Sequence, residues 1–414
     1  MIFFKYHSIY KFIYRDINKN LNFICILVLI ITVNINFFVK ESFASDAVSQ
    51  DLGLDNEMWV PLIDNGRPFI VVNVQINSKS VQALFDTGAA KTLVDIELAR
   101  KFGFTIESRG YIGAVGGQAN YYETDLKSLS IGGLRQSGGK VGVVDMSPLR
   151  GVVGDAFSMI IGADILSQFA VEVDWDHARL RLMRSGNKSL KGMPIPLRIQ
   201  AGYNHFITEF SIGDRIFRDV FLDTGAYNSA VRALFIPELM GPEPRVTDVK
   251  GAGIGGDTIV DFGRINRVKM GKMYIGSLSV EFLPFVCPCL EKYQARIGVN
   301  LLHHFNFLMD ARAGYIIVGP RSSEKSVEKK STSGIQGILK PDGLHIVHVM
   351  RGSPAAKVGL KPGDRICAVD GALMNANRNA DGKRSGWSTD APGKQVTLQL
   401  CDGRAKHLTL AEFY

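Results

Sequence analysis

The amino-acid sequence carries the same pattern twice, about 135 residues apart. The segment Ala83–Ala89 (ALFDTGA) returns 137 residues later as Val220–Ala226 (VFLDTGA). The segment Ile161–Leu166 (IGADIL) returns 136 residues later as Ile297–Leu302 (IGVNLL). Solenoid repeats have much shorter periods, of roughly 20–50 residues. The spacing therefore predicts one duplicated unit and excludes a stack of short repeats.

Each copy of the unit has the sequence pattern of a β fold. Residues 71–77 and 206–212 alternate apolar and polar residues, which predicts a strand followed by a turn in each copy. Glycine-rich segments at 113–117 and 251–256 lie at matching places. Helical patterns are scarce, and residues 96–102 and 233–240 are expected to form one or two turns each. The sequence predicts an all-β-dominated fold with two similar lobes.

Two aspartates stand at the same place in the two copies. Asp86 and Asp223 each follow an apolar strand and each precede Thr-Gly, namely Thr87-Gly88 and Thr224-Gly225. Glycine lets the backbone turn tightly and approach a substrate closely. We expect the two threonine hydroxyls to hydrogen-bond across to the opposite loop.

Duplication supplies a geometry for this pair. Related lobes usually pack about a pseudo-twofold axis, which would bring Asp86 and Asp223 face to face. Two carboxyl groups a few ångströms apart share a proton and titrate as a coupled pair. Such a pair can activate water with one member and hydrogen-bond a peptide carbonyl with the other. The alternative is that the two motifs are structural turns or form an inactive pair. A single Asp-Thr-Gly would usually be only a turn.

Residues 56–320 resemble two retropepsin-like aspartic protease units fused in one chain. The strand-Asp-Thr-Gly-Ala motif of that family matches at 86–89 and 223–226. Its apolar-apolar-Gly element matches at Ile160-Ile161-Gly162 and, with Arg296 in place of an apolar residue, at Arg296-Ile297-Gly298.

The resemblance implies a fold and an activity. It implies retropepsin-like β lobes in a pseudo-twofold acid-protease arrangement, with Asp86 and Asp223 as an aspartic endopeptidase dyad. It implies flaps with tips at Gly116-Gly117 and Gly255-Gly256 over a protein or peptide substrate. Retropepsins are normally homodimers, so a chain with both units is expected to act as a monomer.

The sequence departs from pepsin-type enzymes immediately after the motif. Those enzymes have Ser or Thr there, whereas this chain has Ala89 and Ala226. With fewer hydrogen bonds to the ionised form, the dyad pKa values should be higher than in pepsin. We therefore predict a mildly acidic to near-neutral pH optimum.

The C-terminal segment is a separate module. Residues 343–371 resemble the PDZ domains of bacterial exported proteases, which implies a small α+β domain over 334–414. By resemblance, the loop Ile335-Gln336-Gly337-Ile338 would bind a peptide C-terminus. The helix that normally walls the groove should fall within 374–391, where apolar periodicity is weak. Peptide recruitment and docking on the lobes both stay open as roles for this domain.

The N-terminal segment is typical of an export signal or an anchor. Four basic residues between Lys5 and Lys19 precede an uncharged apolar run over 23–39, and Ser42-Phe43-Ala44 follows. A cleaved signal and an uncleaved membrane anchor both stay open. Either one places the rest of the chain outside the cytoplasm, in the periplasm or facing outward.

These features divide the chain into five parts. We expect a signal or anchor at 1–44, lobe 1 at 45–187, lobe 2 at 188–320, a solvated linker at 321–333 and the PDZ domain at 334–414.

Composition excludes several other classes. A charged fraction of 21% and a hydrophobic fraction of 46% exclude a mostly disordered chain. The net charge of +8 forms no basic stripe, so nucleic acid is not an expected partner. His303-His304 and Cys287-Pro288-Cys289 lack further ligands, so we predict no metal or other cofactor. Cys367 and Cys401 could form a disulfide in an oxidising compartment. The alternative to a protease is a catalytically silent peptide-binding or scaffold protein.

Overall fold

The computed structural model describes residues 51–414 apart from 154–155, 285–292, 323–329 and 375–385. The predicted signal or anchor at 1–44 and the pair Cys287 and Cys289 lie outside the described residues. Within the described part, no helix is both long enough and apolar enough to cross a membrane.

Lobe 1 contains one large sheet, three short helices and three further strands (β2, β12 and β13) that belong to a separate sheet. Its strands are β1 (Asp51–Leu54), β2 (Trp59–Pro61), β3 (Val71–Ile76), β4 (Lys79–Phe85), β5 (Leu93–Asp95), β6 (Glu107–Ala114), β7 (Gly117–Asp125), β8 (Ser128–Ile131), β9 (Leu134–Ser137), β10 (Lys140–Val144), β11 (Met159–Ile161), β12 (Ala170–Asp174) and β13 (Arg179–Met183). Its helices are α3 (Ile96–Lys101), α4 (Ser147–Val153) and α5 (Ala163–Leu166). The sheet order is β1-β9-β8-β3-β4-β11-β5-β10-β7-β6.

Lobe 2 repeats seven consecutive strands of that sheet. Its strands are β14 (Pro194–Pro196), β15 (Arg198–Gln200), β16 (His205–Ile212), β17 (Arg215–Leu222), β18 (Ser229–Arg232), β19 (Thr247–Gly253), β20 (Gly256–Met270), β21 (Met273–Leu283), β22 (Ala295–Ile297), β23 (Phe305–Asp310) and β24 (Tyr315–Pro320). The short helices are η1 (Ala233–Phe235), α6 (Ile236–Met240) and α7 (Val299–Leu302). The order β16-β17-β22-β18-β21-β20-β19 parallels β3-β4-β11-β5-β10-β7-β6 of lobe 1 strand for strand.

Local sequence explains these elements. In β3, the sequence VVNVQI alternates buried and exposed positions after its first residue, as a strand with one covered face requires. Helix α3 begins where the side chain of Asp95 accepts a hydrogen bond from the Glu97 N–H, an N-cap interaction. The predicted short helices at 96–102 and 233–240 are both present.

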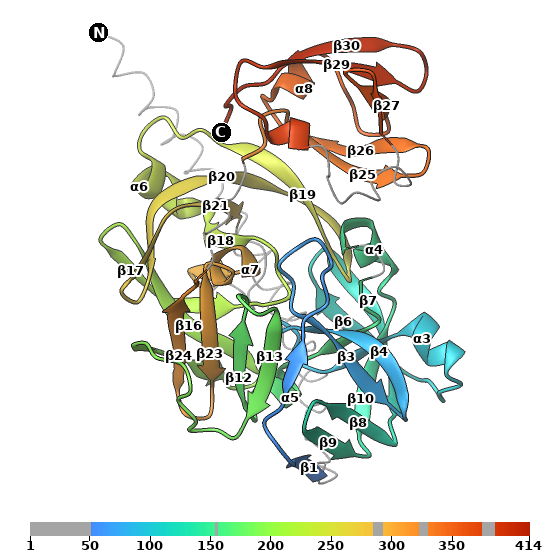
Figure 1. Ribbon diagram of the computed structural model, residues 1–414, viewed down its shortest axis with the longest axis vertical. Coiled ribbons are helices and arrows are strands. Elements are labelled where there is room, and N and C mark those ends of the chain that lie inside the picture. Colours follow the sequence, from blue (N-terminus) through green and yellow to red (C-terminus); the bar gives the residue numbers. More distant parts are fainter. Residues whose placement is uncertain (1–50, 154–155, 285–292, 323–329, 375–385) are drawn as a thin grey trace, which may run out of the picture. The chain divides into compact units, whose positions relative to one another are not determined.

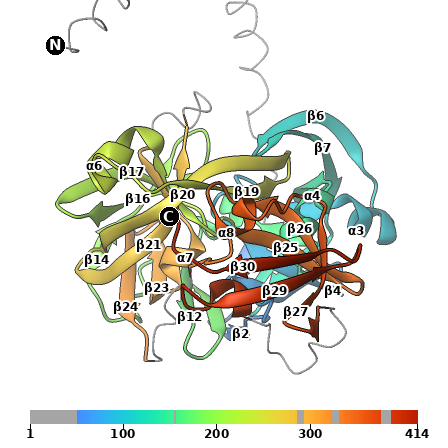
Figure 2. The ribbon, with the colours of Figure 1, turned by 90° about the horizontal axis from the view of Figure 1, so that it is seen from above.

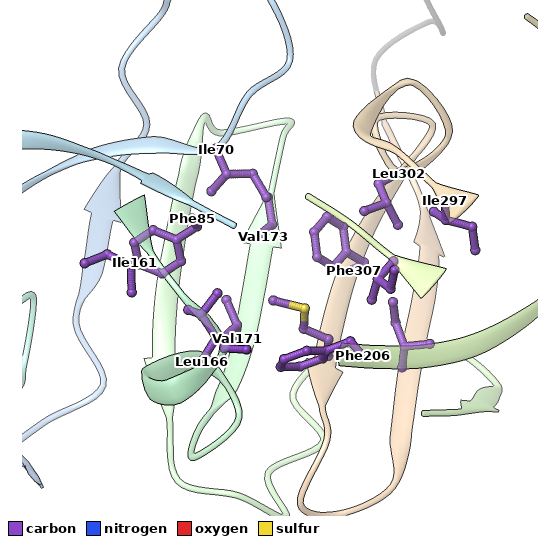
Figure 3. Close-up of a cluster of buried hydrophobic side chains, with 14 of the residues drawn as sticks. Ile70, Phe85, Ile161, Leu166, Val171, Val173, Phe206, Ile297, Leu302 and Phe307 are labelled. Carbon is purple, nitrogen blue, oxygen red and sulfur yellow. The ribbon is translucent and has the colours of Figure 1, made fainter. Parts of the chain in front are cut away.

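A third sheet joins the two lobes. Its order is β14-β24-β23-β12-β13-β2, and its central pair is β12 of lobe 1 against β23 of lobe 2. These two strands run antiparallel, with Ala170 opposite Asp310 and Val173 opposite Phe307. One continuous apolar core spans both lobes along this sheet, and Figure 3 shows side chains of both lobes gathered over β12 and β23. The two lobes therefore form one protease-like body.

The C-terminal domain has its own sheet and core. Its elements are β25 (Ile335–Lys340), β26 (Gly343–Val349), α8 (Pro354–Lys357), β27 (Arg365–Val369), β28 (Ala372–Leu373), η3 (Gly386–Thr389), β29 (Gln395–Leu400) and β30 (Ala405–Thr409). The strand order is β25-β26-β27-β29-β30, with β28 beside β27 and with β29 and β30 forming a hairpin (Figure 2). A disulfide joins Cys367 on β27 to Cys401, just after β29, with the two Cα atoms 5.0 Å apart.

The structure corrects two predictions in this region. Thr332 and Ser333 were predicted in a solvated linker, but they are 5% and 0% exposed and donate backbone hydrogen bonds to the Ser388 carbonyl. The linker is therefore shorter than 321–333, since the PDZ fold begins before Gly334. Residues 335–338 were predicted to form a loop, but they belong to strand β25, because they pair with β26. Most of the expected groove helix lies outside the described residues, and residues 386–389 form a 3-10 turn.

Candidate active site

The two motif aspartates lie at equivalent strand ends. Asp86 follows β4 and Asp223 follows β17. The backbone N–H of Asp86 donates to the carbonyl of Ile161 at 3.0 Å, and that of Asp223 donates to Ile297 at 2.9 Å. Each aspartate is thus tied to the parallel strand beside it, β11 or β22. The structure brings the two copies of the motif together.

A reciprocal set of four hydrogen bonds joins the two loops. The Thr87 hydroxyl donates to the Leu222 carbonyl at 2.6 Å, and the Thr224 hydroxyl donates to the Phe85 carbonyl at 2.7 Å. Each hydroxyl also accepts the backbone N–H of the other threonine, at 3.0 and 3.1 Å. Both threonines are 0% exposed. This cross-linking is the one expected from the sequence, and it fixes the two aspartates relative to each other.

The two motif glycines leave room for the carboxyl groups. The N–H of Gly88 donates to Oδ1 of Asp86 at 2.7 Å, and the N–H of Gly225 donates to Oδ1 of Asp223 at 3.2 Å. A Cβ on Gly88 would overlap the Asp223 carboxyl group, and one on Gly225 would overlap that of Asp86. Each carboxyl group therefore lies against the glycine of the opposite motif, so that any side chain there would displace it.

The carboxyl pair is strongly coupled. Burial raises the pKa of Asp86, and the charge of Asp223 raises it further, to about 7. Burial also raises the pKa of Asp223, but the charge of Arg296 and a hydrogen bond with Asp86 oppose that rise. Asp223 is 13% exposed. Two carboxyl groups coupled in this way can share one proton and one negative charge.

The apolar-apolar-Gly element supports each loop from behind. The N–H of Ala163, after Gly162, donates to the Ala89 carbonyl at 2.8 Å. In lobe 2, the N–H of Val299, after Gly298, donates to the Ala226 carbonyl at 2.9 Å. Strand β22 keeps the pairing of β11 despite Arg296, so the departure at this residue leaves the backbone arrangement intact.

The predicted flap glycines lie at the ends of two long hairpins, β6–β7 and β19–β20 (Figure 1). The N–H of Gly255 donates to the carbonyl of Val115 at 3.0 Å, so the two tips contact each other. A Cβ on Gly116 would overlap the backbone of Gly256. Ile254 at one tip and Ala89 after the first motif pack on the same apolar cluster. The hairpins therefore approach the loops that carry the aspartates.

Sequence reasoning assigned no role to a charged group beside Asp223. Nη2 of Arg296 lies 2.7 Å from Oε2 of Glu281, and its Nε lies 4.0 Å from Oδ2 of Asp223. A signal was present in the sequence, because Arg296 and Glu281 each stand directly between two apolar residues.

The PDZ domain contacts the flap of lobe 2. The side-chain amide of Gln336 accepts the N–H of Lys250 on β19 at 2.8 Å and donates to the carbonyl of the same residue at 3.3 Å. Gln336 was predicted to bind a peptide, and in the structure it binds the backbone N–H and carbonyl of one flap residue, Lys250. Ile335, Gly337 and Ile338 lie on the same strand.

Further contacts surround this one. The Arg351 guanidinium donates to Asp261 at 2.8 Å, and its backbone N–H donates to Asp248 at 2.7 Å. The His348 ring lies 3.0 Å from the same Asp248 carboxylate. Val249 and Phe262 of the flap are buried in an apolar cluster with Met350 and Tyr414 of the PDZ domain. The base of the lobe 2 flap is thus packed against a second domain.

Two family models match the chain. Residues 72–168 match a model described as a gag-polyprotein putative aspartyl protease, and residues 322–410 match the PDZ domain. No curated protein matches the sequence. The first match covers Asp86 but ends before lobe 2. The place of Asp223 in the candidate site therefore rests on the geometry described above.

The chain is thus similar to proteins of two kinds. It contains an aspartyl-protease-like domain and a PDZ domain. With its strand-rich lobes, this combination matches a retropepsin-like protease with a C-terminal PDZ domain.

Proposed function

We propose that this protein is an extracytoplasmic aspartic endopeptidase that hydrolyses peptide bonds with Asp86 and Asp223. The observation that carries the proposal is the reciprocal bonding of Thr87 and Thr224, which fixes the two carboxyl groups against each other. Both halves of the pair belong to one chain, so the active form is proposed to be a monomer.

The reaction needs one proton on the pair. The ionised carboxylate takes a proton from water as the oxygen attacks the peptide carbonyl carbon, and the protonated carboxyl donates to the carbonyl oxygen. The resulting gem-diol then returns a proton to the pair as the C–N bond breaks, and the leaving nitrogen receives the proton first taken from water. Protons balance over the cycle without a covalent intermediate or a metal ion.

Substrate access would depend on the two flaps. Their tips contact each other through Gly255 and Val115, so a peptide has to separate or displace them. The PDZ domain holds the base of one flap through Gln336, Arg351 and the cluster around Tyr414. We therefore propose that the PDZ domain regulates the protease through this flap. Peptide recruitment by the edge strand β25 is the alternative role.

The proposed compartment rests on two features. The sequence at 1–44 is typical of a signal or an anchor. The disulfide between Cys367 and Cys401 suits an oxidising environment such as the periplasm.

The proposal is tested by incubating the full chain with a denatured protein substrate between about pH 3 and pH 8 and identifying products by mass spectrometry. Asp86→Asn and Asp223→Asn should each lower the rate at least about 100-fold, because each removes a proton donor or acceptor. Asp214→Asn, a change at a residue that is 93% exposed, is the matched control. Cleavage that survives either motif change, or a folded wild type that cleaves nothing, would favour a silent scaffold.

A further inference from the structure

The strand beside each aspartate has an apolar residue at its centre in lobe 1 and a charged residue at the same position in lobe 2. On β11, Ile160 is 2% exposed and packs in an apolar cluster. Arg296 takes the corresponding position on β22, and its side chain is 15% exposed. A guanidinium therefore lies on the Asp223 side of the pair, whereas the equivalent position beside Asp86 is apolar.

Two contacts fix the orientation of this guanidinium. Nη2 of Arg296 donates to Oε2 of Glu281 at 2.7 Å and to the carbonyl of Asn228 at 3.2 Å. Glu281 is 14% exposed and also accepts from Nδ2 of Asn228 at 3.0 Å. Because the guanidinium is planar, anchoring Nη2 also restricts where Nε can point.

The Nε atom is the part of Arg296 nearest the dyad. It lies 4.0 Å from Oδ2 of Asp223, and it is buried without a hydrogen-bond partner among the described residues. A buried donor without an acceptor destabilises a fold, because it has lost its hydrogen bonds to water. Attraction between Nε of Arg296 and Asp223 offsets this destabilisation only when the Asp223 carboxylate is ionised. The geometry therefore favours the state in which Asp223 carries the negative charge and Asp86 carries the proton.

We propose that Arg296 is a positioning residue that gives the dyad its polarity. It holds Asp223 as the ionised member that takes a proton from water, and it leaves the shared proton on Asp86, which donates to the peptide carbonyl. This inference rests on the proposed function. The charged groups that face Asp223 are Asp86 from the end of β4 and Arg296 from β22, with Glu281 of β21 behind the guanidinium.

The directions of the pKa shifts agree with this assignment. The charge of Asp223 raises the pKa of Asp86, whereas the charge of Arg296 lowers the pKa of Asp223 against the effect of burial. The charge of Arg296 thus acts on Asp223 in the direction that the proposed polarity requires.

The first test is the pH dependence of kcat/KM for the full chain. Arg296→Ile installs the residue of lobe 1, and it should move the acidic limb to higher pH by about one unit or more, because an opposite charge near a carboxylate is lost. The alkaline limb, which reports Asp86, should move less. Arg296→Lys keeps the charge and should keep the acidic limb near its wild-type position.

A matched control comes from a second buried ion pair. Arg181 lies 2.7 Å from Glu172, with exposures of 21% and 10%, in the sheet that joins the lobes. Arg181→Met should lower stability without moving either limb. If Arg296→Ile lowers the rate equally at every pH with both limbs unchanged, Arg296 has only a structural role and the proposal is wrong.

The second test does not need activity. The carboxyl carbons of ¹³C-labelled aspartate are titrated by NMR in the full chain, with Asp86→Asn and Asp223→Asn used for assignment. Asp223 should ionise first, and Arg296→Ile should move its midpoint to higher pH. If Asp86 ionises first, the polarity is overturned even in an active enzyme. If Asp223 ionises first in a protein that cleaves nothing, the polarity stands and the proposed function alone fails.

Discussion

The loop after Asp86 and the loop after Asp223 share the backbone hydrogen bonds described above but are held by different side chains. In lobe 1, the Asp164 carboxylate accepts from the N–H and hydroxyl of Thr92 at 3.0 and 2.8 Å. In lobe 2, the amide oxygen of Asn300 accepts the same two bonds from Ser229, both at 2.8 Å. The loop shape thus depends on a correctly placed acceptor and hydroxyl, and not on charge.

The neighbouring strands differ more. In lobe 1, Ile160 pairs with Leu93 of β5, which in turn pairs with Gly142 of β10. The matching row of lobe 2 is Arg296, Ala230 and Glu281, and its two outer members form an ion pair. A Cβ on Gly142 would overlap Leu93, so lobe 1 has no room for a larger residue there. The two lobes therefore show that one backbone can keep its register while the electrostatic surroundings of its aspartate change.

The flaps show a third difference. Within the described residues, the hydrogen bonds between the protease-like lobes and the PDZ domain are made by the β19–β20 flap, including those of Lys250 and Asp248. The two flaps are therefore expected to differ in how readily they open.

The largest expected effect tests what the lobes share. Thr87→Val would remove the hydroxyl that binds the Leu222 carbonyl and the Thr224 N–H. Thr224→Val would remove the hydroxyl that binds the Phe85 carbonyl and the Thr87 N–H. At about 1–3 kcal/mol for each unsatisfied group, each variant should lose about 4 kcal/mol of unfolding free energy in urea titrations. The control Thr208→Val removes one bond and should lose less. A large inequality between the two motif variants would show that the lobes are not equivalent at this point.

The second prediction concerns pH and the Asp86 side of the pair. Because the pKa of Asp86 is raised to about 7 in the folded state, folding holds a proton that the unfolded chain releases near pH 4. This contribution is fully present below about pH 4 and is lost as the pH rises through about 7. Asp86→Asn should therefore be more stable than wild type above about pH 7, by on the order of 3 kcal/mol. Urea titrations at about pH 4 and pH 8 measure this difference. An equal response of both proteins to pH would contradict it.

The third prediction places a methyl group on each side of the dyad. Gly88→Ala displaces the Asp223 carboxyl group and Gly225→Ala displaces that of Asp86. Each should lower kcat about 100-fold, as expected when a reacting group moves by about an ångström. The exposed turn residue Gly403 provides the control Gly403→Ala, which should affect stability and not kcat. If only one motif glycine mattered, the two carboxyl groups would not lie against each other's loops.

The smallest expected effect tests the difference between the flaps. Gln336→Ala removes the two bonds to Lys250 and should destabilise β19 locally by about 1–2 kcal/mol. Hydrogen exchange measured by mass spectrometry should then become about tenfold faster over 247–253 and stay unchanged over 107–114. The control Gln395→Ala changes an exposed residue of β29. Equal acceleration in both flaps would show that the contact does not act on one flap alone.

Much of the protease-like part was predictable because its signals are local and repeated. The duplicated motif identified Asp86 and Asp223, and the alternating runs identified the strands that carry them. The expectation that Thr87 and Thr224 bond across the lobes followed from where a hydroxyl must point when two such loops meet.

The missed features depend on contacts between distant segments. Arg296 was visible as a charge in an apolar element, but its distance from Asp223 depends on Glu281, which comes from another strand. Gln336 was predicted to bind a peptide in a loop, and only the docking of two domains reveals Lys250 as its partner. Thr332 and Ser333 are small polar residues of the kind found in linkers, but they are buried and bind the Ser388 carbonyl through their backbone N–H groups.

The sheet that joins the lobes has a consequence for the distance between the two aspartates. Strands β12 and β23 meet in a fixed register, with Val173 opposite Phe307. A slip of one residue would shift the lobes by about 3.3 Å and turn every inward side chain outward. The separation of the carboxyl groups therefore depends on apolar residues in another sheet as well as on the bonds between Thr87 and Thr224. A substitution that only loosens this strand pair can weaken hydrolysis while every residue of both motifs stays unchanged.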